Sequence, residues 1–435
     1  MTNIVPTANY QYDWKSALTK IKAAQAAFRA TVLNNPKFKW YQRSVWMVSL
    51  GWSLILAYQS IPFYQAIGQG EASYKAGLYK AAEQQFLIAL EQAKKFPPAD
   101  LRRAKALNNL AELYRTEGQY QAAEPLYINA VEIARQLRSG RPELPLALNN
   151  VATLYREEGK YAQAEAAFTQ ALSVWEKTIK RKDDDHYATI LNGFGKLKRD
   201  EGRYSEAERY YKEALSIKEK LLGKNDVELA AVLENLGGVK RDEGKLAEAE
   251  VIYSRALAID EAALGREHPY TATDMNNLAG LLRDQNQLYR AGLLYEEALA
   301  IRKKVLPEDH PQIAKSYDGL AELELARGRY SQAATNARAA IAMQIRCLGK
   351  THPELATSYD LLASVYFADH NYNAARLYYE KALTIRRSAL SAQHPDLGVL
   401  YLHLGRLSLA EGKGHEAFQN ARLACTILSQ ALSPD

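Results

Sequence analysis

Cysteine is nearly absent from this 435-residue sequence, which contains only Cys347 and Cys425. Two cysteines cannot form the disulfide framework of a small secreted domain, and they cannot supply a zinc site by themselves. The sequence also lacks a phosphate-binding glycine loop and any GxSxG, HExxH or CxxC motif. We therefore expect no catalytic residues, no cofactor and no metal, and the sequence predicts a protein that is not an enzyme.

The excess positive charge is confined to the N-terminal 43 residues, which hold seven basic residues and a single acid, Asp13. The rest of the chain holds 49 basic and 49 acidic residues. Nucleic-acid binding requires a concentrated basic surface that neutralises phosphates. The neutral body therefore argues against a nucleic-acid partner.

Residues 44–70 contain no charge, and their centre reads SVWMVSLGWSLILAYQSIPF. As a helix, the segment 44–63 has roughly the length needed to cross ~30 Å of hydrocarbon. Aromatic residues such as Trp46, Trp52 and Tyr58 line it, as in the belts at membrane interfaces. The segment could be a signal anchor, a cleaved signal peptide, or a buried or interfacial helix. The anchor is favoured, because the 43 residues before it are too many for an ordinary signal peptide.

The flanks of this segment predict its orientation. Lys37, Lys39 and Arg43 precede it, whereas the charges after it balance. By the positive-inside rule, a single-pass anchor would leave residues 1–43 in the cytosol and the body on the far side. A cytoplasmic or peripheral protein is the alternative. Residues 1–43 also contain an apolar stripe at helical spacing, which predicts an amphipathic helix on the membrane surface, on a partner or on the first repeat. The stripe consists of Trp14, Leu18, Ile21, Phe28 and Val32.

The remainder of the chain, residues 64–435, is an internal repeat with a period of about 42 residues. One turn position recurs nine times, and it is occupied by glycine in seven copies and by Asn286 or His370 in the others. These are residues that tolerate a left-handed backbone. We call these positions anchors: Gly77, Gly118, Gly159, Gly202, Gly244, Asn286, Gly328, His370 and Gly412.

Small and large residues alternate around each anchor. Alanine stands five residues and again twelve residues after every anchor, for example at Ala207 and Ala214. Only glycine or alanine stands seven residues before it, as at Gly195. Nine residues after the anchor an aromatic residue is usual, such as Tyr211, although Ala337 and Ala421 depart from this. The pattern predicts two closely packed helices in each copy.

The run ALNNLAxLYxxEGxYxxAExLYxxALxI, matched closely by residues 105–134, strongly resembles the tetratricopeptide repeat. The period of 42 residues is similar to the kinesin-light-chain subtype of that family. The resemblance implies an all-α fold, a right-handed solenoid of about nine helical hairpins, preceded here by the hydrophobic helix. It also implies a non-enzymatic scaffold that binds proteins or peptides.

The dipeptide His-Pro recurs at His268, His310, His352 and His394. A metal array is one interpretation, but equivalent positions of stacked repeats lie roughly 10 Å apart, too far to share one ion at ~2 Å bonds. The sequence favours the other interpretation, in which proline begins a helix and histidine caps it or lines the loop.

Arginine stands three residues before the anchor in five consecutive copies, and asparagines stand nine or ten residues before it. Six or seven residues of separation place both rows near one face of the first helix. In the resembled family this helix lines a concave groove, so these residues are candidates for binding an acidic or carboxylate-terminated peptide. The alternative is that each arginine pairs with a nearby acid in its own or the next repeat. The candidates are Asn109, Arg115, Asn150, Arg156, Asn192, Arg199, Asn235, Arg241, Asn277 and Arg283.

The sequence therefore predicts a basic N-terminal segment (1–43), a transmembrane anchor (44–63) and a repeat solenoid (64–435). Its expected function is that of a membrane-anchored scaffold that binds a protein or peptide partner in the groove. A permanent structural or assembly subunit of a larger membrane complex is the second hypothesis. Mild-detergent purification separates the two, because a permanent subunit would be recovered at fixed stoichiometry.

Overall fold

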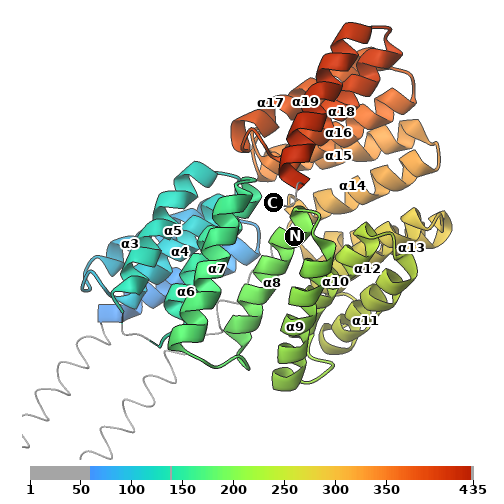
Figure 1. Ribbon diagram of the computed structural model, residues 1–435. Helices are drawn as coiled ribbons and strands as arrows, with labels where there is room; N and C mark the ends of the chain where they lie inside the picture. The colour runs from blue at the N-terminus through green and yellow to red at the C-terminus, as the bar shows by residue number, and fades with distance from the viewer. Residues whose placement is uncertain (1–58, 138–139, 433–435) are drawn as a thin grey trace, which may run out of the picture. The chain divides into compact units, whose positions relative to one another are not determined.

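The computed structural model describes residues 59–137 and 140–432, and every regular element within them is helical. The chain divides into two compact units, one ending at Leu113 and the other beginning at Tyr114. Within the second unit, successive helices form antiparallel hairpins that stack in chain order (Figure 1). The predicted all-α stack of hairpins is therefore confirmed for the described residues.

Each hairpin consists of a first and a second helix on either side of an anchor, and hairpins are numbered here by anchor from one to nine. Hairpin one is formed by residues 59–75 and α3. A short 3-10 helix, η2 (Val227–Leu229), precedes α10. The helices are α3 (Tyr79–Ala93), α4 (Leu101–Thr116), α5 (Tyr120–Arg135), α6 (Glu143–Glu157), α7 (Tyr161–Thr178), α8 (Asp185–Asp200), α9 (Tyr204–Leu222), α10 (Ala230–Asp242), α11 (Leu246–Leu264), α12 (Pro269–Asp284), α13 (Leu288–Val305), α14 (Pro311–Ala326), α15 (Tyr330–Cys347), α16 (Pro353–Ala368), α17 (Tyr372–Ala389), α18 (Pro395–Ala410) and α19 (Gly414–Leu432).

All nine anchors adopt the left-handed conformation that the sequence predicted. The glycine anchors have φ between 69° and 76°, and the two exceptions, Asn286 and His370, have φ of 60° and 58°. A left-handed residue ends the first helix and redirects the chain into the second. The anchor spacing therefore fixes where each hairpin turns.

The helices of a hairpin approach closely because small residues face large rings. Tyr211 is fully buried, and a Cβ added at Gly195 would lie only 2.8 Å from its ring. The same relation holds between Gly237 and Tyr253. The alanines five and twelve residues after the anchor, such as Ala207 and Ala214, are also fully buried. The alternation of small and large residues thus determines how closely the two helices of a hairpin pack.

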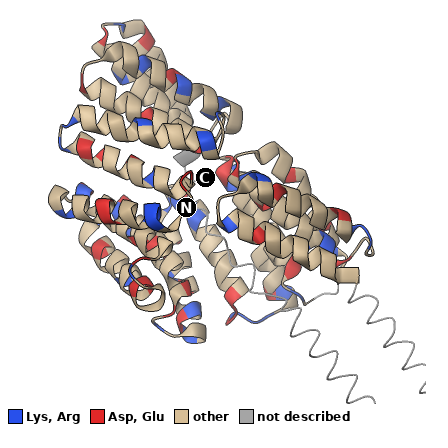
Figure 2. Ribbon diagram, turned by 180° about the vertical axis from the view of Figure 1, so that it is seen from behind, with Lys and Arg blue, Asp and Glu red and all other residues tan. Residues whose placement is uncertain are grey.

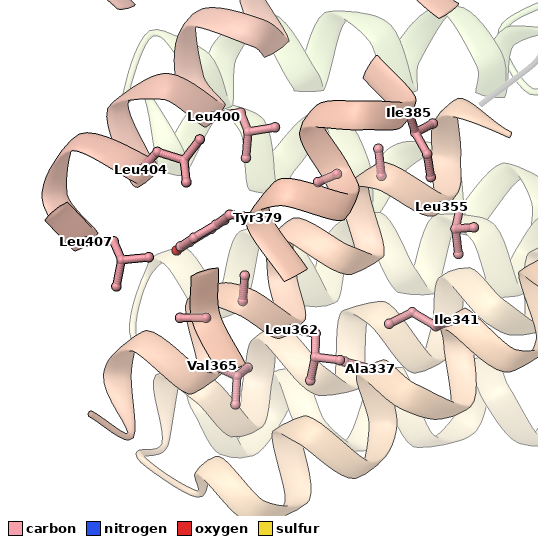
Figure 3. Packing of buried hydrophobic residues seen from close by; sticks show 14 of the residues in the cluster. Ala337, Ile341, Leu355, Leu362, Val365, Tyr379, Ile385, Leu400, Leu404 and Leu407 are labelled. Carbon is pink, nitrogen blue, oxygen red and sulfur yellow. The ribbon is translucent and has the colours of Figure 1, made fainter. Parts of the chain in front are cut away.

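The C-terminal hairpins share one continuous apolar core. Tyr379 of α17 points between α17 and α18, toward Leu400, Leu404 and Leu407 (Figure 3). Ala337 stands where most hairpins have an aromatic ring, and it is buried in the same core. The aromatic ring that is absent at this position is therefore replaced in the core by neighbouring side chains, which pack around Ala337.

The first unit has its own aromatic core within residues 59–113. Phe63 and Phe96 lie edge to face with ring centroids 6.4 Å apart, and Gly70 permits the close approach of Phe86. The predicted anchor 44–63 lies mostly outside the described residues. Among the helices that the structure describes, none is both long and apolar enough to cross a membrane.

Candidate functional site

The predicted arginine row forms a ladder of ion pairs that links successive hairpins. Arg115 lies 2.5 Å from Glu157 of the next hairpin, and Arg156 lies 2.6 Å from Asp200. Arg199 pairs with Asp242 and Arg241 pairs with Asp284, each at 2.5 Å. The row ends with Arg283, which pairs with Glu322 and with Asp284. The ion pairs that the sequence left as an alternative are therefore present, and a ligand at this row would have to compete with them.

Glycines on the first helices make room for the guanidinium groups. A Cβ at Gly238 would lie 2.6 Å from Nη1 of Arg199, and one at Gly280 would lie 3.4 Å from Nη1 of Arg241. Both arginine side chains remain about a third exposed, at 32% and 31%. Two arginines in the middle of the row are therefore held in place but still reach solvent.

The asparagine row also links successive hairpins. The Asn235 amide donates to the Asn192 side-chain oxygen at 3.0 Å, and Asn277 hydrogen-bonds to the Glu234 carboxylate. The Asn150 side chain accepts from its neighbour Asn149 at 3.4 Å. In the first unit, Asn109 donates to Glu71 at 3.2 Å. Like the arginines, these amides make internal contacts without a ligand.

The sequence did not single out Lys196, which stands on α8 between the asparagine and arginine positions. It is partly buried, and it has no hydrogen bond or ion pair with any described residue. Burial lowers its pKa to about 8, and the positive charges of Arg156 and Arg115 also lower it, whereas Glu157 opposes them. The sequence did contain one signal for this residue. Six residues before the anchor this hairpin has a lysine, whereas the adjacent hairpins have Thr153 and Gly238. Lys196 is thus a cation on this face without a partner.

Burial favours the neutral form of two carboxyl groups further along the first helices. Burial raises the pKa of Asp318 to about 8, although its carboxylate accepts a 2.7 Å hydrogen bond from Ser358. Burial also raises the pKa of Asp274, and the charges of Glu234 and Asp260 raise it further. Protonated carboxyls do not repel an anion. The arginines of hairpins four to six are each paired with an acid, so Lys196 is the cation of this face that has no ion pair with a described residue.

Lysine, arginine and acids are otherwise interspersed along the helices of the second unit (Figure 2). Many buried cations are fully paired in the structure. Lys198, for example, bonds to Glu165 of the preceding hairpin and lies 3.0 Å from Glu201. This pairing makes the isolated position of Lys196 more notable, because burying an unpaired charge costs free energy.

The four His-Pro dipeptides begin first helices, as the sequence favoured. In each, proline occupies the first turn, and the histidine side chain accepts the backbone N–H two residues later. No group of histidine, cysteine or acidic residues in the described parts of the chain could hold a metal ion. The four capping hydrogen bonds confirm the helix-capping interpretation.

Two of these histidines lie where hairpins that are distant in sequence meet. We call the contact of His352 with Thr116 and that of Ser391 with Glu158 the clasp. His352 Nε2 lies 2.7 Å from the Thr116 carbonyl oxygen, and the Ser391 N–H donates to the Glu158 carbonyl at 2.9 Å. His394 lies beside Gly159, where an added Cβ would be 2.6 Å from its ring. The turns of hairpins two and three thus meet the loops that precede hairpins eight and nine.

The fold and the repeated contacts define a solenoid of helical hairpins, and comparison with known families agrees. The family model of the tetratricopeptide repeat matches seven overlapping stretches of this chain, which are residues 66–136, 102–177, 143–220, 228–304, 276–346, 312–388 and 354–430. The chain therefore belongs to the tetratricopeptide repeat family, and its repeats have a period of about 42 residues. No curated protein matches the sequence.

Several solved structures are similar to this chain. A Rap protein complexed with Competence and Sporulation Factor has a TM-score of 0.55 and 14% identity, and the match covers 85% of this chain and 99% of that one. BtubC (BKLC) from P. vanneervenii has a TM-score of 0.41 and 24% identity, over 57% and 91% of the two chains. Kinesin-light-chain repeats from Podospora anserina have a TM-score of 0.40 and 24% identity, over 48% and 97%. At these identities the likeness shows the fold alone.

Proposed function

We propose that this chain is a non-enzymatic scaffold that binds a peptide segment or partner protein along its first helices. The expected ligand is acidic or carries a C-terminal carboxylate. It would lie across α6, α8, α10 and α12, where the asparagine and arginine rows follow one another. Every residue in these helices belongs to a repeat unit, which leaves no stretch for a separate enzyme domain.

The observation that carries this proposal is the unpaired Lys196 beside Arg156. A carboxylate at this position would gain a direct ion pair and would also raise the pKa of the lysine, so binding and protonation favour each other. Arg199, one turn further along α8, is about a third exposed and could exchange Asp242 for a ligand carboxylate. A Rap protein of this fold was solved in complex with a factor, which supports ligand binding by such a stack.

The test uses labelled acidic peptides with either a free or an amidated C-terminus, titrated onto the whole chain. Lys196→Met should weaken binding of the best peptide about ten-fold, which corresponds to ~1.4 kcal/mol. Lys220→Met is the matched control, because Lys220 is exposed and has no ion pair among the described residues. Binding should also weaken as salt rises. Equal losses for the two variants, or no binding of any acidic peptide, would refute the proposed ligand.

We further propose that residues 44–63 anchor the chain in a membrane as a single-pass helix, with residues 1–43 in the cytosol. This proposal is supported by the charge-free run and by the basic residues before it. Protease added to sealed vesicles whose cytosolic face points inward should digest residues beyond Gly70. Protection of the repeat body in these vesicles would contradict the orientation, and extraction of the chain by alkaline carbonate would contradict the anchor.

A further inference from the structure

One position of each second helix faces the hairpin that follows it. This position stands six residues after the anchor. Glu165 bonds to Lys198 of the next hairpin, and Glu208 lies 2.8 Å from Lys240. Arg376 reaches Glu411 and Glu416 at 2.5 and 2.6 Å. The residue at this position is therefore a contact to the following hairpin.

Two positions of the first helix face the following hairpin in the same way. Three residues before the anchor, the arginines pair with acids of the next first helix, as Arg199 does with Asp242. Ten residues before it, Asn192 accepts a hydrogen bond from Asn235. Asp360 lies 2.8 Å from His403 in the same register. Most of these partners lie on the first helix of the next hairpin, so a single helix covers all three positions.

In the ninth hairpin these three positions hold Leu402, Leu409 and Phe418, and we call them the end face. Their exposed fractions are 45%, 69% and 69%, and no described residue covers them. An exposed apolar face on a stack of hairpins is open to association. At the three positions that contact a following helix, hairpins three and four thus carry polar residues, whereas hairpin nine carries large apolar residues.

The charges near the end face are basic. Arg422 is exposed and has no ion pair with a described residue; Arg406 is likewise exposed and without an ion pair, and its guanidinium group lies 5.7 Å from the centroid of the Phe367 ring of the preceding hairpin. Arg422 stands in the register of Arg338, which bonds to Tyr366 of the following hairpin. The nearby acids Glu411 and Glu416 are already held by Arg376. An incoming helix would therefore meet an apolar centre and unpaired cations.

We propose that the end face binds an amphipathic helix of a partner protein, with an apolar ridge and acidic flanks, which packs where the first helix of a further hairpin would lie. The three contact positions predict that the occupant is a helix, and the arginines without ion pairs predict that its flanks are acidic. A second copy of this chain docked through the same face would bring Arg406 and Arg422 of both copies into one interface. Like charges there oppose such a dimer.

The test uses the whole chain and two synthetic helices of about 20 residues. Both peptides carry the same leucine ridge, but one has glutamate flanks and the other has lysine flanks. The glutamate peptide should bind more tightly. The double substitution Leu409→Glu and Phe418→Glu should weaken its binding at least ten-fold. The matched control is Val251→Glu with Tyr289→Glu, which changes equally exposed apolar residues and adds the same charge.

Each outcome decides for or against the proposal. Both double variants should melt like the unsubstituted chain, because the altered side chains are more than two-thirds exposed. Loss of binding only in the end-face variant, with a glutamate preference reduced by Arg422→Gln, supports it. Equal binding of the two peptides refutes the acidic partner, and binding of neither refutes the site. A concentration-dependent dimer that the end-face variant abolishes would assign the face to a second copy instead.

Discussion

Replacing Gly195 with alanine tests whether small residues are required where helices of a hairpin meet. The added methyl carbon would lie 2.8, 3.0 and 3.1 Å from three carbons of the Tyr211 ring. This ring is fully buried and cannot move aside freely. Overpacking of this kind costs about 1–3 kcal/mol, whereas alanine gains up to about 1 kcal/mol over glycine in a helix. The overpacking cost should exceed the gain, so the variant should be less stable.

Gly68→Ala provides the control. Gly68 is also within a helix, but an added Cβ there would meet no atom within 4 Å. That variant should be more stable by roughly 0.5–1 kcal/mol, which makes the two substitutions differ by about 1–3 kcal/mol. Because a repeat array need not unfold in one step, urea unfolding should be accompanied by amide exchange of α8 and α9. Equal stabilisation by both substitutions would refute the packing argument.

Three further predictions concern packing, the arginine row and the clasp. Ala249→Leu, at a fully buried position, should cost about 1–3 kcal/mol in thermal or urea unfolding, and an unchanged midpoint would contradict this. Arg199→Ala with Arg241→Ala should weaken acidic-peptide binding per folded molecule; if only the melting temperature falls, these arginines serve as internal ion pairs alone. Burial lowers the pKa of His352, whereas the negative charge of Glu354 and the hydrogen bond to the Thr116 carbonyl raise it. The neutral ring, with Nδ1 free to accept the Glu354 N–H, is therefore favoured in the folded chain, so the stability that His352 contributes is complete above the ordinary histidine pKa of about 6.5 and is lost as pH falls below it. Exchange protection of the Ser391 amide, corrected for intrinsic rate and compared with Gly349, should stay constant above about pH 6.5 and fall toward about pH 5.5, and constant protection over the whole range would exclude a histidine-controlled clasp.

His352→Asn separates capping from the clasp, because asparagine is a good N-cap but does not titrate. His268→Asn is its matched control, since His268 caps α12 in the same way and makes no hydrogen bond to a distant hairpin among the described residues. The first change should reduce the pH dependence of Ser391 exchange, whose remainder belongs to the adjacent His394, and the second should leave it intact. Similar behaviour of the two variants would mean that the clasp does not depend on His352.

The ladder of ion pairs changes how the arginine row should be understood. Each guanidinium group joins two hairpins, so the row contributes to the register between repeats as well as to any binding. Pairs that are partly exposed contribute little each, and a ligand carboxylate can replace an internal partner at modest cost. The same residues can therefore be occupied internally without a ligand and still serve the proposed function.

Most of the fold could be predicted from the sequence because its determinants are local and repeated. Left-handed anchors such as Gly202, the glycine and alanine positions that face Tyr211, and the histidine caps before proline each depend on residues close in sequence. Nine copies of one pattern strengthened every assignment. The arginine and asparagine rows were found in the same way, because their spacing alone places them near one face.

Other features were decided only by the tertiary structure. The sequence offered several acids near each arginine, and hairpin stacking selected one in the next repeat, such as Asp242 for Arg199. Stacking also leaves Lys196 without an ion pair among the described residues, while Lys198 and Arg199 on the same helix are paired. The contact between His352 and Thr116 joins residues 236 positions apart. It depends on small rotations between hairpins that accumulate over the stack, and no local pattern of residues specifies their sum.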